Sequence, residues 1–394
     1  MSHDIYNYPK RIECVLKKIK NDKEIIDRNK ELLLEFYKIC RSEGLSPARI
    51  VRCLYAIIIF AEWSKKDFNQ FNKNDIIDLV AELESHKYAH STKQEMKITL
   101  RKFFKWLRGT EEYPEEVRWL KCHRTLNNNK LPEDMLTEDE VKLLINTADN
   151  ARDKALIAVL YDSGCRIGEL LSLKMKHIKF DYQSAVILVD GKTGMRRVRI
   201  IASAPYLKEW IDEHPHKDDP DASIWILENK NKELNHSDIK RILRKIRKLS
   251  GIKKRINAHN FRHSRATFLA DYLTDSQMKE FFGWVQSSKM ASVYIHMSGK
   301  NLDKALFKLN GIEDNENEKK EETDFKSKKC SRCGEISPPT NKFCSKCGYV
   351  LDNETMLEIM ENDFERGRAD KIMDRLIKDS EFKEMFLRKM KEII

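Results

Sequence analysis

The spacing of apolar side chains predicts helices over the first part of the chain. Between Arg28 and Gly109, apolar residues recur every three to four positions, which is the period of a helix that buries one face. Ser46 stands where such a helix takes its N-cap, and Pro47 suits the first turn because proline lacks the amide hydrogen that has no partner there. We therefore expect a helical domain over residues 1–112.

A second domain follows a stretch that has two prolines and few apolar residues, which predicts a linker over 113–132. Thr137 and Glu140 have the spacing of a capping box, in which each side chain binds a free amide at the start of a helix. After several helical segments the period changes to two in SAVILVD and MRRVRIIAS, which the turn GKTG joins as a hairpin. We expect an α+β fold over 133–312, mainly α with a small antiparallel β-sheet.

The C-terminal part of the chain has three segments that differ in composition. Residues 313–329 carry seven acids and five bases but one large apolar side chain, Phe325, so ordering them gains too little burial and a flexible tether is predicted. A compact cysteine-rich segment follows over 330–351. The remaining residues, 352–394, mix apolar and charged positions at helical spacing and predict an amphipathic helical tail.

Composition and charge narrow the classes of partner. Glycine and proline make up 22 of the 394 residues, too few for a turn-dense all-β fold. The net charge of +11 favours a polyanion such as nucleic acid. No apolar run approaches the roughly 20 residues that cross a bilayer, and the first residues lack a secretory signal pattern. We therefore expect a cytoplasmic protein with no membrane contact.

Two of the expected helices carry basic faces. The segment STKQEMKITLRKFFKWLR has six bases against one acid, and so does 237–250. Such faces are usually only solvated, but together these two are able to grip opposite sides of a duplex, and two domains with a linker between them form a C-shaped clamp. The residues that we expect to contact DNA are Lys93, Lys97, Arg101, Lys105, Arg108, Lys240, Arg244 and Arg247.

The cysteine-rich segment CSRCGEISPPTNKFCSKCGYV predicts a metal site. Each CxxC turn directs two thiolates at one point, and the glycine after each pair lets the chain fold back over the ion. So short a segment has no core of its own, whereas a structural zinc ion contributes on the order of 10 kcal/mol. Because all four ligands come from protein, the zinc is expected to be structural, in a zinc ribbon; whether the ribbon binds DNA, binds protein or only ends the chain stays open. The ligands are Cys330, Cys333, Cys344 and Cys347.

A further set of residues is spread along the second domain in the motifs SGCRIGELLSL, GKTGMRRVRI, HNFRHSRAT and FFGWVQSSKMASVYIHMS. In chain order the set is Arg166, Lys192, His259, Arg262, Trp284 and Tyr294. Taken together, these motifs resemble the tyrosine recombinase (phage-type integrase) family, of an archaeal-like or Xer-like kind, over about residues 28–311. The resemblance implies a helical core-binding domain before a catalytic domain, and a homo-tetramer on paired double-stranded DNA sites that is a monomer or dimer without DNA.

These residue types suit the cleavage of a DNA phosphodiester with no metal or other cofactor in the active site. Arg166 and Arg262 are suited to clamping the phosphate, since a guanidinium fork meets two oxygens at once. Such preorganised donors stabilise the charge of the transition state. By the resemblance, Tyr294 attacks the phosphorus and forms a 3′-phosphotyrosyl intermediate, which preserves the energy of the phosphodiester and makes ATP unnecessary.

The proton transfers are expected to fall to other members of the set. His259 is suited to taking and returning the tyrosine proton, because imidazole titrates near neutral pH. Lys192, in the hairpin turn, is placed to protonate the leaving 5′ oxygen, although it has the alternative role of an ordinary surface lysine. Trp284 stands where many members of the family have histidine, and it cannot transfer a proton. We expect His263 to be structural or to support a neighbouring catalytic residue, and Glu169 to orient Arg166.

Three functions agree with these observations. The leading one is a site-specific recombinase or integrase. The second is a type IB topoisomerase-like enzyme, which makes the same cut but relaxes one duplex, and the third is a DNA-binding protein that retains the fold without catalysis. Synaptic assembly separates the first two, and loss of the covalent adduct in Tyr294→Phe separates both from the third.

Overall fold

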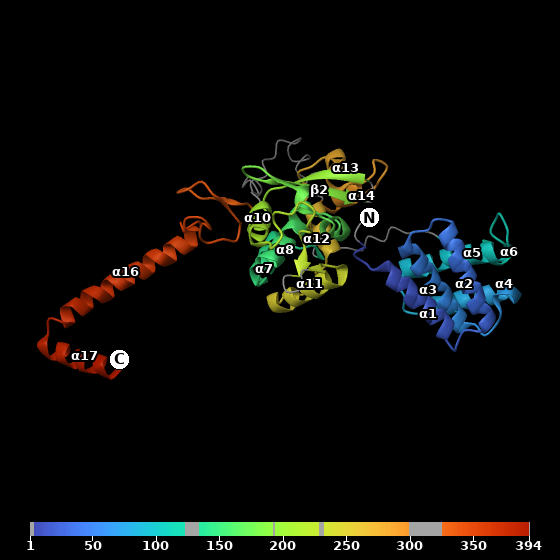
Figure 1. Ribbon diagram of the computed structural model, residues 1–394, viewed down its shortest axis with the longest axis horizontal. Coiled ribbons are helices and arrows are strands. Elements are labelled where there is room, and N and C mark those ends of the chain that lie inside the picture. The colour runs from blue at the N-terminus through green and yellow to red at the C-terminus, as the bar shows by residue number, and fades with distance from the viewer. Residues whose placement is uncertain (1–3, 123–133, 192–193, 228–231, 299–324, 394) are drawn as a thin grey trace, which may run out of the picture. The chain divides into compact units, whose positions relative to one another are not determined.

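The computed structural model describes residues 4–122, 134–191, 194–227, 232–298 and 325–393 (Figure 1). The chain divides into two compact units, 1–129 and 130–394, each with its own core. Helices dominate both units, and the strands form small antiparallel sheets, which confirms the predicted α+β class. No helix among the described residues has the length and apolar character that a membrane span requires.

The first unit is helical throughout its described residues. Helix α3 (Pro47–Trp63) lies at the centre of its core. Nine of the 17 residues of α3 are buried, because α1, α2 and α5 all pack on it. Aromatic side chains fill the centre, where the rings of Phe36, Phe68 and Phe103 meet edge to face. The other elements are α1 (Tyr8–Asn21), α2 (Asp27–Ser42), the 3-10 turn η1 (Phe68–Gln70), α4 (Lys73–Ser85), α5 (His90–Leu107) and α6 (Glu115–Arg118).

Two details of the first unit differ from the sequence-based expectation. Ser46 stands at the N-cap of α3, but its side chain makes no capping bond, and its carbonyl oxygen accepts the amides of Arg49 and Ile50 instead. Short helix α6 lies within the predicted linker and packs on α4 and α5. Because Val117 and Leu120 are buried in the core, the first unit continues past residue 112.

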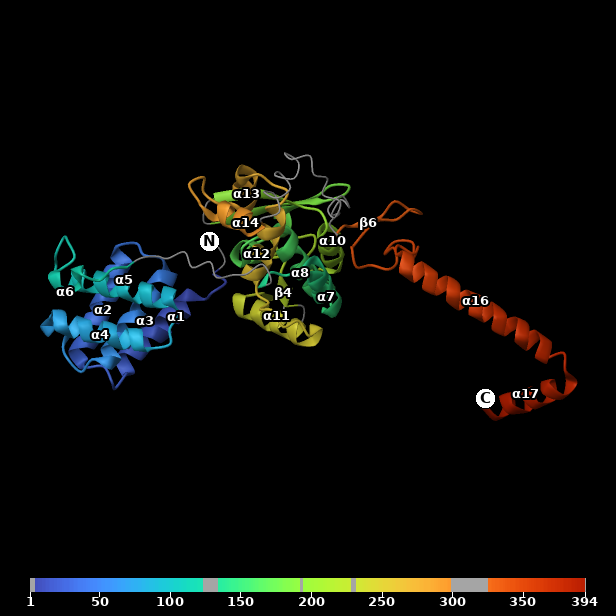
Figure 2. The ribbon, with the colours of Figure 1, turned by 180° about the vertical axis from the view of Figure 1, so that it is seen from behind.

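The second unit is built around α8 (Ala151–Ser163), in which 11 of 13 residues are buried. Helices α7 (Glu138–Thr147), α10 (Ala204–Glu213) and α12 (Ala258–Leu269) surround it (Figure 2). The predicted capping box opens α7: the Thr137 hydroxyl accepts the Glu140 amide at 3.2 Å, and the Glu140 carboxylate accepts the Thr137 amide at 2.9 Å. The other helical elements are α9 (Ile167–Leu171), η3 (Met175–His177), α11 (His236–Ser250), α13 (Asp275–Phe282) and α14 (Met290–Ser298).

The predicted hairpin forms the centre of a three-stranded antiparallel sheet. Strand β2 (Ala185–Gly191) pairs with β3 (Gly194–Ile200) so that Gly191 faces Gly194 at the turn. Strand β1 (Ile178–Phe180) pairs with the other edge of β2. A two-stranded sheet joins β4 (Ile226–Leu227) to β5 (Lys232–Glu233).

The described C-terminal residues form a small cysteine-rich module and two helices. Strands β6 (Lys328–Lys329) and β7 (Ile336–Ser337) pair in the module, and α16 (Asn353–Leu376) and α17 (Ser380–Ile393) follow. Phe325 belongs to the predicted tether, yet its side chain is buried against Tyr161 with the ring centroids 5.6 Å apart. The end of that segment is therefore packed, and its residues 313–324 lie outside the described part.

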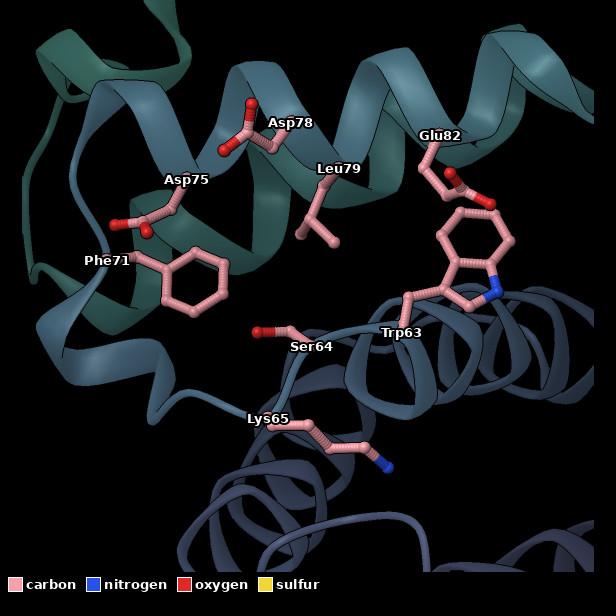
Figure 3. Close-up of a pocket in the computed structure, with 8 residues that line it drawn as sticks. All are labelled: Trp63, Ser64, Lys65, Phe71, Asp75, Asp78, Leu79 and Glu82. Atoms are coloured by element: carbon pink, nitrogen blue, oxygen red, sulfur yellow. The ribbon is translucent and has the colours of Figure 1, made fainter.

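One hollow in the first unit has mainly acidic and aromatic walls (Figure 3). Its acidic groups suit a cation and repel a phosphate, and none of the six motif residues belongs to this unit. The hollow is therefore not the expected phosphate site. The hollow is lined by Trp63, Ser64, Lys65, Phe71, Asp75, Asp78, Leu79 and Glu82.

Candidate active site

Arg166 stands at the N-cap of α9, directly after the turn that ends α8. In that turn Gly164 has a φ of 54°, in the left-handed region that favours glycine. A Cβ at this position would lie 2.5 Å from the ring of Phe282, so glycine is also required for α13 to pack against the turn. The short sequence SGCR therefore places Arg166 beside the end of α13.

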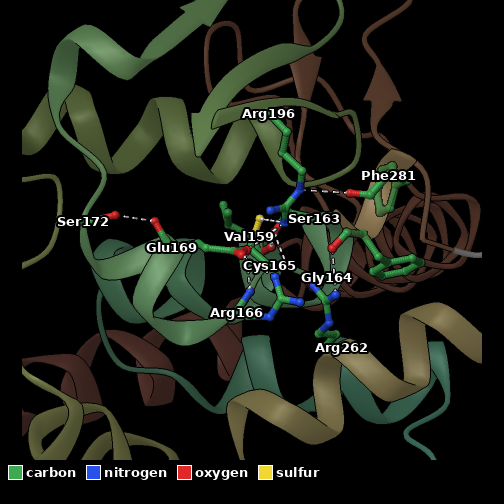
Figure 4. A network of polar contacts seen from close by, with 11 residues as sticks. Val159, Ser163, Gly164, Cys165, Arg166, Glu169, Ser172, Arg196, Arg262 and Phe281 are labelled. Atoms are coloured by element: carbon green, nitrogen blue, oxygen red, sulfur yellow. Dashed lines mark hydrogen bonds and ion pairs between the residues drawn. The ribbon is translucent and has the colours of Figure 1, made fainter. Parts of the chain in front are cut away.

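Glu169 connects Arg166 to the hairpin (Figure 4). Its Oε1 accepts Arg166 Nη1 at 2.7 Å, and its Oε2 accepts the Arg166 amide at 3.0 Å and Arg196 Nη2 at 2.7 Å. Although burial raises the pKa of Glu169, bonding to Arg196 and Arg166 outweighs it and holds the pKa below its usual range. The buried carboxylate is thus ionised and fixes two arginines, which agrees with the expected orienting role.

Arg262 is buried beside this network, with 5% of its surface exposed. Its Nη1 donates to the Gly164 carbonyl at 2.8 Å and its Nη2 donates to the Phe282 carbonyl at 2.7 Å. The guanidinium also lies over the Trp284 ring, 5.6 Å from its centroid. These contacts fix the side chain between the ends of α8 and α13.

The two motif arginines form a region of uncompensated positive charge. Burial and the nearby charge of Arg166 lower the pKa of Arg262 to about 10, so Arg262 is still a cation at neutral pH. The Arg262 bonds go to neutral carbonyls, and Glu169 is shared with Arg196. An anion bound between Arg166 and Arg262 would relieve their repulsion.

Tyr294 lies in the same pocket, on α14. Its ring stacks in parallel on Trp284, at a centroid distance of 5.6 Å and an angle of 3°, and its surface is 3% exposed. The hydroxyl makes a hydrogen bond with His263 Nδ1. Burial raises the pKa of Tyr294 to about 12, against the influence of the Arg262 charge.

The two histidines of the motif HNFRHS have different surroundings. His259 is exposed, and its ring meets the ring of His263 edge to face, with centroids 4.7 Å apart. It is His263, expected to be structural, that contacts the Tyr294 hydroxyl. The signal was the spacing of four, which puts both histidines on one face of a helix.

Arg196 is a site residue that the sequence analysis missed. Its Nε donates to the Phe281 carbonyl at 3.2 Å, while its Nη2 binds Glu169. A Cβ at Gly283 would lie 2.9 Å from its guanidinium, so the chain must pass this arginine closely. On β3 it is one of three arginines in MRRVRI, and the period of two puts it on the buried face with Val198 and Ile200, opposite to Arg197. That alternation is the signal that could have identified it. The remaining motif residue, Lys192, lies outside the described residues.

Most members of the first predicted basic face already have partners in their own unit. Lys93 and Lys97 form ion pairs with Glu84 at 3.1 and 2.7 Å. The guanidinium of Arg101 lies 3.8 Å from the Tyr113 ring centroid. The Lys105 ammonium lies 5.7 Å from the same centroid, and Arg108 binds Glu116 at 2.7 Å.

The second basic face, on α11, is more open. Lys240 and Arg244 are exposed, and neither forms an ion pair within the described part of the chain. Arg247 instead donates to the carbonyls of Ile252 and Lys253 at the end of the helix. The structure therefore brings two of the three predicted α11 contacts to the surface without an ion-pair partner among the described residues.

The four cysteines of the C-terminal module gather at one point. Their sulfur atoms all lie within 4.8 Å of one another, with Cys330 and Cys347 3.6 Å apart and Cys333 and Cys344 3.5 Å apart. A tetrahedral zinc ion with Zn–S bonds of about 2.3 Å places its sulfurs about 3.8 Å apart, so the group fits a metal such as zinc. Four thiolate ligands from protein suit a structural ion.

The module lies against α10. The Tyr206 hydroxyl and the Thr340 hydroxyl are 2.7 Å apart, and the Thr340 amide donates to Tyr206 at 3.2 Å. An ion pair of 3.2 Å joins Lys208 to Glu335. These hydrogen bonds and this ion pair hold the module against α10, within the second unit.

Comparisons with known proteins agree with this geometry. The phage integrase family matches residues 134–300, which include all six motif positions but end before the cysteines. The tyrosine recombinase XerA of Pyrococcus horikoshii is 27% identical over 307 residues, covering 75% of this chain and 98% of the relative. A tyrosine recombinase of Thermosipho africanus is 29% identical, covering 64% of this chain and 89% of the relative.

Solved structures share the fold. A lambda integrase dimer bound to a core site matches with a TM-score of 0.55 at 17% identity, covering 68% of this chain and 77% of that one. The XerH recombinase in a post-cleavage complex with difH matches with a TM-score of 0.52 at 20% identity, covering 78% and 97%. Residues 134–300 therefore match the phage integrase family, and the chain is similar to tyrosine recombinases, the tyrosine-type enzymes that break and rejoin DNA.

Proposed function

We propose that this enzyme is a site-specific recombinase or integrase that cleaves and rejoins double-stranded DNA through a 3′-phosphotyrosyl intermediate, without ATP or a catalytic metal. The observation that carries the proposal is the pair of cations Arg166 and Arg262, which repel each other in the pocket that also holds Tyr294. A scissile phosphate is the anion that suits this pair. The similar proteins are tyrosine recombinases, a site-specific recombinase and an integrase, which supports the choice.

In this proposal, the two arginines bind the non-bridging oxygens of the phosphate. Arg262 gives one bond from each terminal nitrogen to a carbonyl, which leaves N–H donors on the same fork for the phosphate. Because Glu169 and the ends of two helices hold the guanidinium groups in place, little reorganisation is needed as charge builds up in the transition state.

The nucleophile needs help from its surroundings. With a pKa of about 12, only about 10⁻⁵ of the Tyr294 side chains are phenolate at pH 7, which corresponds to a cost of about 7 kcal/mol. This value already includes the opposing effect of the Arg262 charge, so a base must take the proton. We propose Lys192 as the acid for the leaving 5′ oxygen and Trp284 as the platform that orients the phenol ring.

We further propose that the enzyme acts as a homo-tetramer on paired DNA sites and is a monomer or dimer without DNA. The lambda integrase has been solved as a dimer on a core site and as a tetramer on a Holliday junction, which supports the proposed assembly. We propose the helical first unit as the DNA-binding domain that precedes the catalytic domain. The exposed bases of α11 supply a second contact with the duplex.

Zinc is the ion that we propose for the cysteine module, with Cys330, Cys333, Cys344 and Cys347 as its ligands. The sulfur spacing supports this choice, and so does the symmetry of the two knuckles: the Gly334 amide donates to the Cys330 carbonyl and the Gly348 amide to the Cys344 carbonyl, both at 2.9 Å. When bound, the ion joins two turns that have little apolar core, which is a structural role.

A nicked suicide substrate tests the proposal. The unchanged protein should become covalently attached to the 3′ end of the cut strand, and Tyr294→Phe should form no adduct. Arg166→Ala should slow cleavage by about 10²–10³-fold while DNA affinity changes little, because the residue acts mainly in the transition state. If Tyr294→Phe formed as much adduct as the unchanged protein, Tyr294 would not be the nucleophile. Relaxation of supercoils by a monomer, without strand exchange, would instead support a topoisomerase.

A further inference from the structure

We propose that the cysteine module and the turn between β1 and β2 form a second DNA-binding surface, which binds the phosphate backbone of a duplex with residues that the pocket of Tyr294 does not use. This ribbon surface consists of Tyr182, Lys329 and Arg332, and Lys179 and Arg197 continue it along the sheet. The motif of the module left open whether it binds DNA, binds protein or only ends the chain. The contacts and charges around it favour DNA.

Tyr182 joins the turn to the module. Its side chain is 70% exposed, although it is a large aromatic residue. The Lys329 ammonium lies 5.8 Å from the centre of the Tyr182 ring, and a Cβ at Gly334 would lie 3.9 Å from the Tyr182 hydroxyl. Gly334 closes the first knuckle of the module, in which the side chain of Arg332 is exposed. The turn and the first knuckle therefore form one continuous surface.

The outer face of the three-stranded sheet continues this surface with further bases. Lys179 and Arg199 lie in one row across β2. Arg199 bonds the carboxylate of Asp181, which belongs to the same turn as Tyr182. Arg197 stands two residues before Arg199 on β3 and so lies on the same exposed face. The bases of the sheet thus extend from the turn that contacts the module.

The exposed bases of the ribbon surface are not neutralised by neighbouring acids. Residues 325–351 hold six bases against one acid, Glu335, which pairs with Lys208 and Lys346. A zinc ion with four thiolates has a net charge of about −2, so the module keeps a positive charge of about 3. The bases that form no ion pair within the described residues are Lys179, Arg197, Lys329 and Arg332.

These groups suit the backbone of DNA. Lysine and arginine side chains neutralise phosphates, and the counterions that are released drive binding. A tyrosine hydroxyl is a usual donor to a phosphate oxygen, which gives the exposed Tyr182 a partner. An acidic protein would also match the charge. DNA is favoured because the proteins to which this chain is similar break and rejoin DNA, and the module packs on the unit that holds the phosphate pocket.

The sign of the charge changes directly after the module. The first half of α16, residues 353–365, has five acids and no base. Its acids lie near the second knuckle, where Glu358 is 4.0 Å from Lys342. An acidic helix repels a phosphate backbone, so the first knuckle is the side of the module that is open to DNA. The two knuckles therefore provide a matched comparison within one module.

The test measures how DNA binding by the full chain depends on salt, from the fluorescence anisotropy of a labelled duplex of arbitrary sequence. The double variant Lys329→Ala and Arg332→Ala should lower the slope of log affinity against log salt by about 2, one unit for each lost phosphate contact. The control, Lys342→Ala with Lys346→Ala, removes the same charge from the same module, but both lysines already face acids, so its slope should change less. Equal slopes for the two double variants would overturn the proposal.

A crosslink locates the DNA directly and requires no loss of charge. With p-benzoylphenylalanine in place of Tyr182, ultraviolet light should join the full chain to the duplex, because the photoreactive group attacks nearby sugar C–H bonds. The control carries the same group in place of Phe364, an aromatic side chain of α16 that is 68% exposed among acids. A yield at position 182 no higher than at position 364 would overturn the proposal.

These readouts are separate from the cleavage chemistry, because binding of a duplex needs no nucleophile. If Tyr294→Phe still formed the adduct while the slopes and crosslinks came out as expected, the proposed function would have failed and the ribbon surface would stand. If the unchanged protein formed its adduct normally but the two double variants had equal slopes, only the ribbon surface would have failed.

Discussion

At the scale of single residues, the active site depends on groups that hold its arginines in place. Arg196 bonds both the buried carboxylate of Glu169 and the carbonyl of Phe281, and so joins three segments that are far apart in the sequence. Its side chain is 10% exposed, and that of Glu169 is 3% exposed. A buried ion pair of this kind is costly to break, because the remaining charge has no water around it.

We predict that Arg196→Met destabilises the protein by about 3 kcal/mol, because the variant leaves the carboxylate of Glu169 with one cation instead of two. Urea unfolding of the full chain measures the change in midpoint. The matched control is Arg197→Met, since Arg197 is the exposed neighbour on the same strand, and it should unfold with the unchanged protein. Equal midpoints for both variants would contradict the structural role of Arg196.

Glu169 also makes stability depend on pH. Its pKa is lower in the folded state than in the unfolded chain, so its contribution is present above the unfolded value of about 4.3 and is lost as the pH falls through the folded value. We predict that the unchanged protein is more stable than Glu169→Gln at pH 7 and that the gap narrows below about pH 4.3. Urea midpoints at a series of pH values test this, and a constant gap would contradict it.

The residues of the site were predictable to different degrees. Arg166, Arg262 and Tyr294 stand in motifs of recognisable order, and the structure gathers them in one pocket. The partners Arg196 and His263 were missed or given another role, because their contacts run across 27 and 31 positions of the chain. Sequence spacing shows which residues share a helix face, but it does not show which neighbour that face meets.

At the scale of elements, the cysteine module packs against the helices of the second unit and does not stand apart from them. Thr340 bonds Tyr206 on α10, and Phe325 fills a place beside Tyr161 on α8. Helix α8 leads directly into the turn before Arg166. The packing of the module thus continues into the helix that supports the active site.

Phe325→Ala should therefore destabilise the second unit by about 3 to 5 kcal/mol, the usual cost of removing a buried aromatic ring. Thermal or urea unfolding of the full chain measures it. The control is Phe364→Ala in α16, where the side chain is 68% exposed and its removal should change stability little. Similar behaviour of the two variants would mean that Phe325 is not part of the core.

Elements with a strong local signal were predicted correctly. The capping box at Thr137, the hairpin of β2 and β3 and the knuckles of the cysteine module depend on residues close in sequence. Short elements were missed: α6 has four residues and β1 has three, too few for a period to be seen. The packing of Phe325 was missed because a single aromatic ring in a charged segment carries no periodicity.

At the scale of the whole molecule, the excess positive charge should govern DNA binding. Affinity should fall steeply with added salt, because each neutralised phosphate releases counterions. We predict that Arg244→Ala lowers the slope of log affinity against log salt by about 1, since this exposed side chain has no ion pair within the described residues. Lys93→Ala is the control: its ammonium is already paired with Glu84, so its slope should change less. If Lys93→Ala lowered the slope more than Arg244→Ala, the main contact with DNA would lie in the first unit.

The metal should matter for the module and not for the chemistry. We predict that Cys344→Ser loses the zinc ion while still cleaving a minimal nicked substrate, because the ligand cluster shares no residue with the phosphate pocket. Metal content and adduct yield are measured on the same preparation. The control is Cys122→Ser, which should keep its zinc. Loss of cleavage in a well-folded Cys344→Ser protein would contradict a structural ion.

The C-terminal end of α13 joins the arginine cluster of the site to the segment that carries the phenol. Two arginines take the carbonyls of Phe281 and Phe282, and the next residue, Gly283, turns the chain with a φ of 60°. The two residues before Gly283 accept hydrogen bonds from the arginines of the site, whereas the loop after Gly283 leads to the helix that carries Tyr294. A residue with a Cβ in place of Gly283 would meet the Arg196 guanidinium at 2.9 Å, so this one glycine lets the arginines and the segment that carries the phenol converge on the same place.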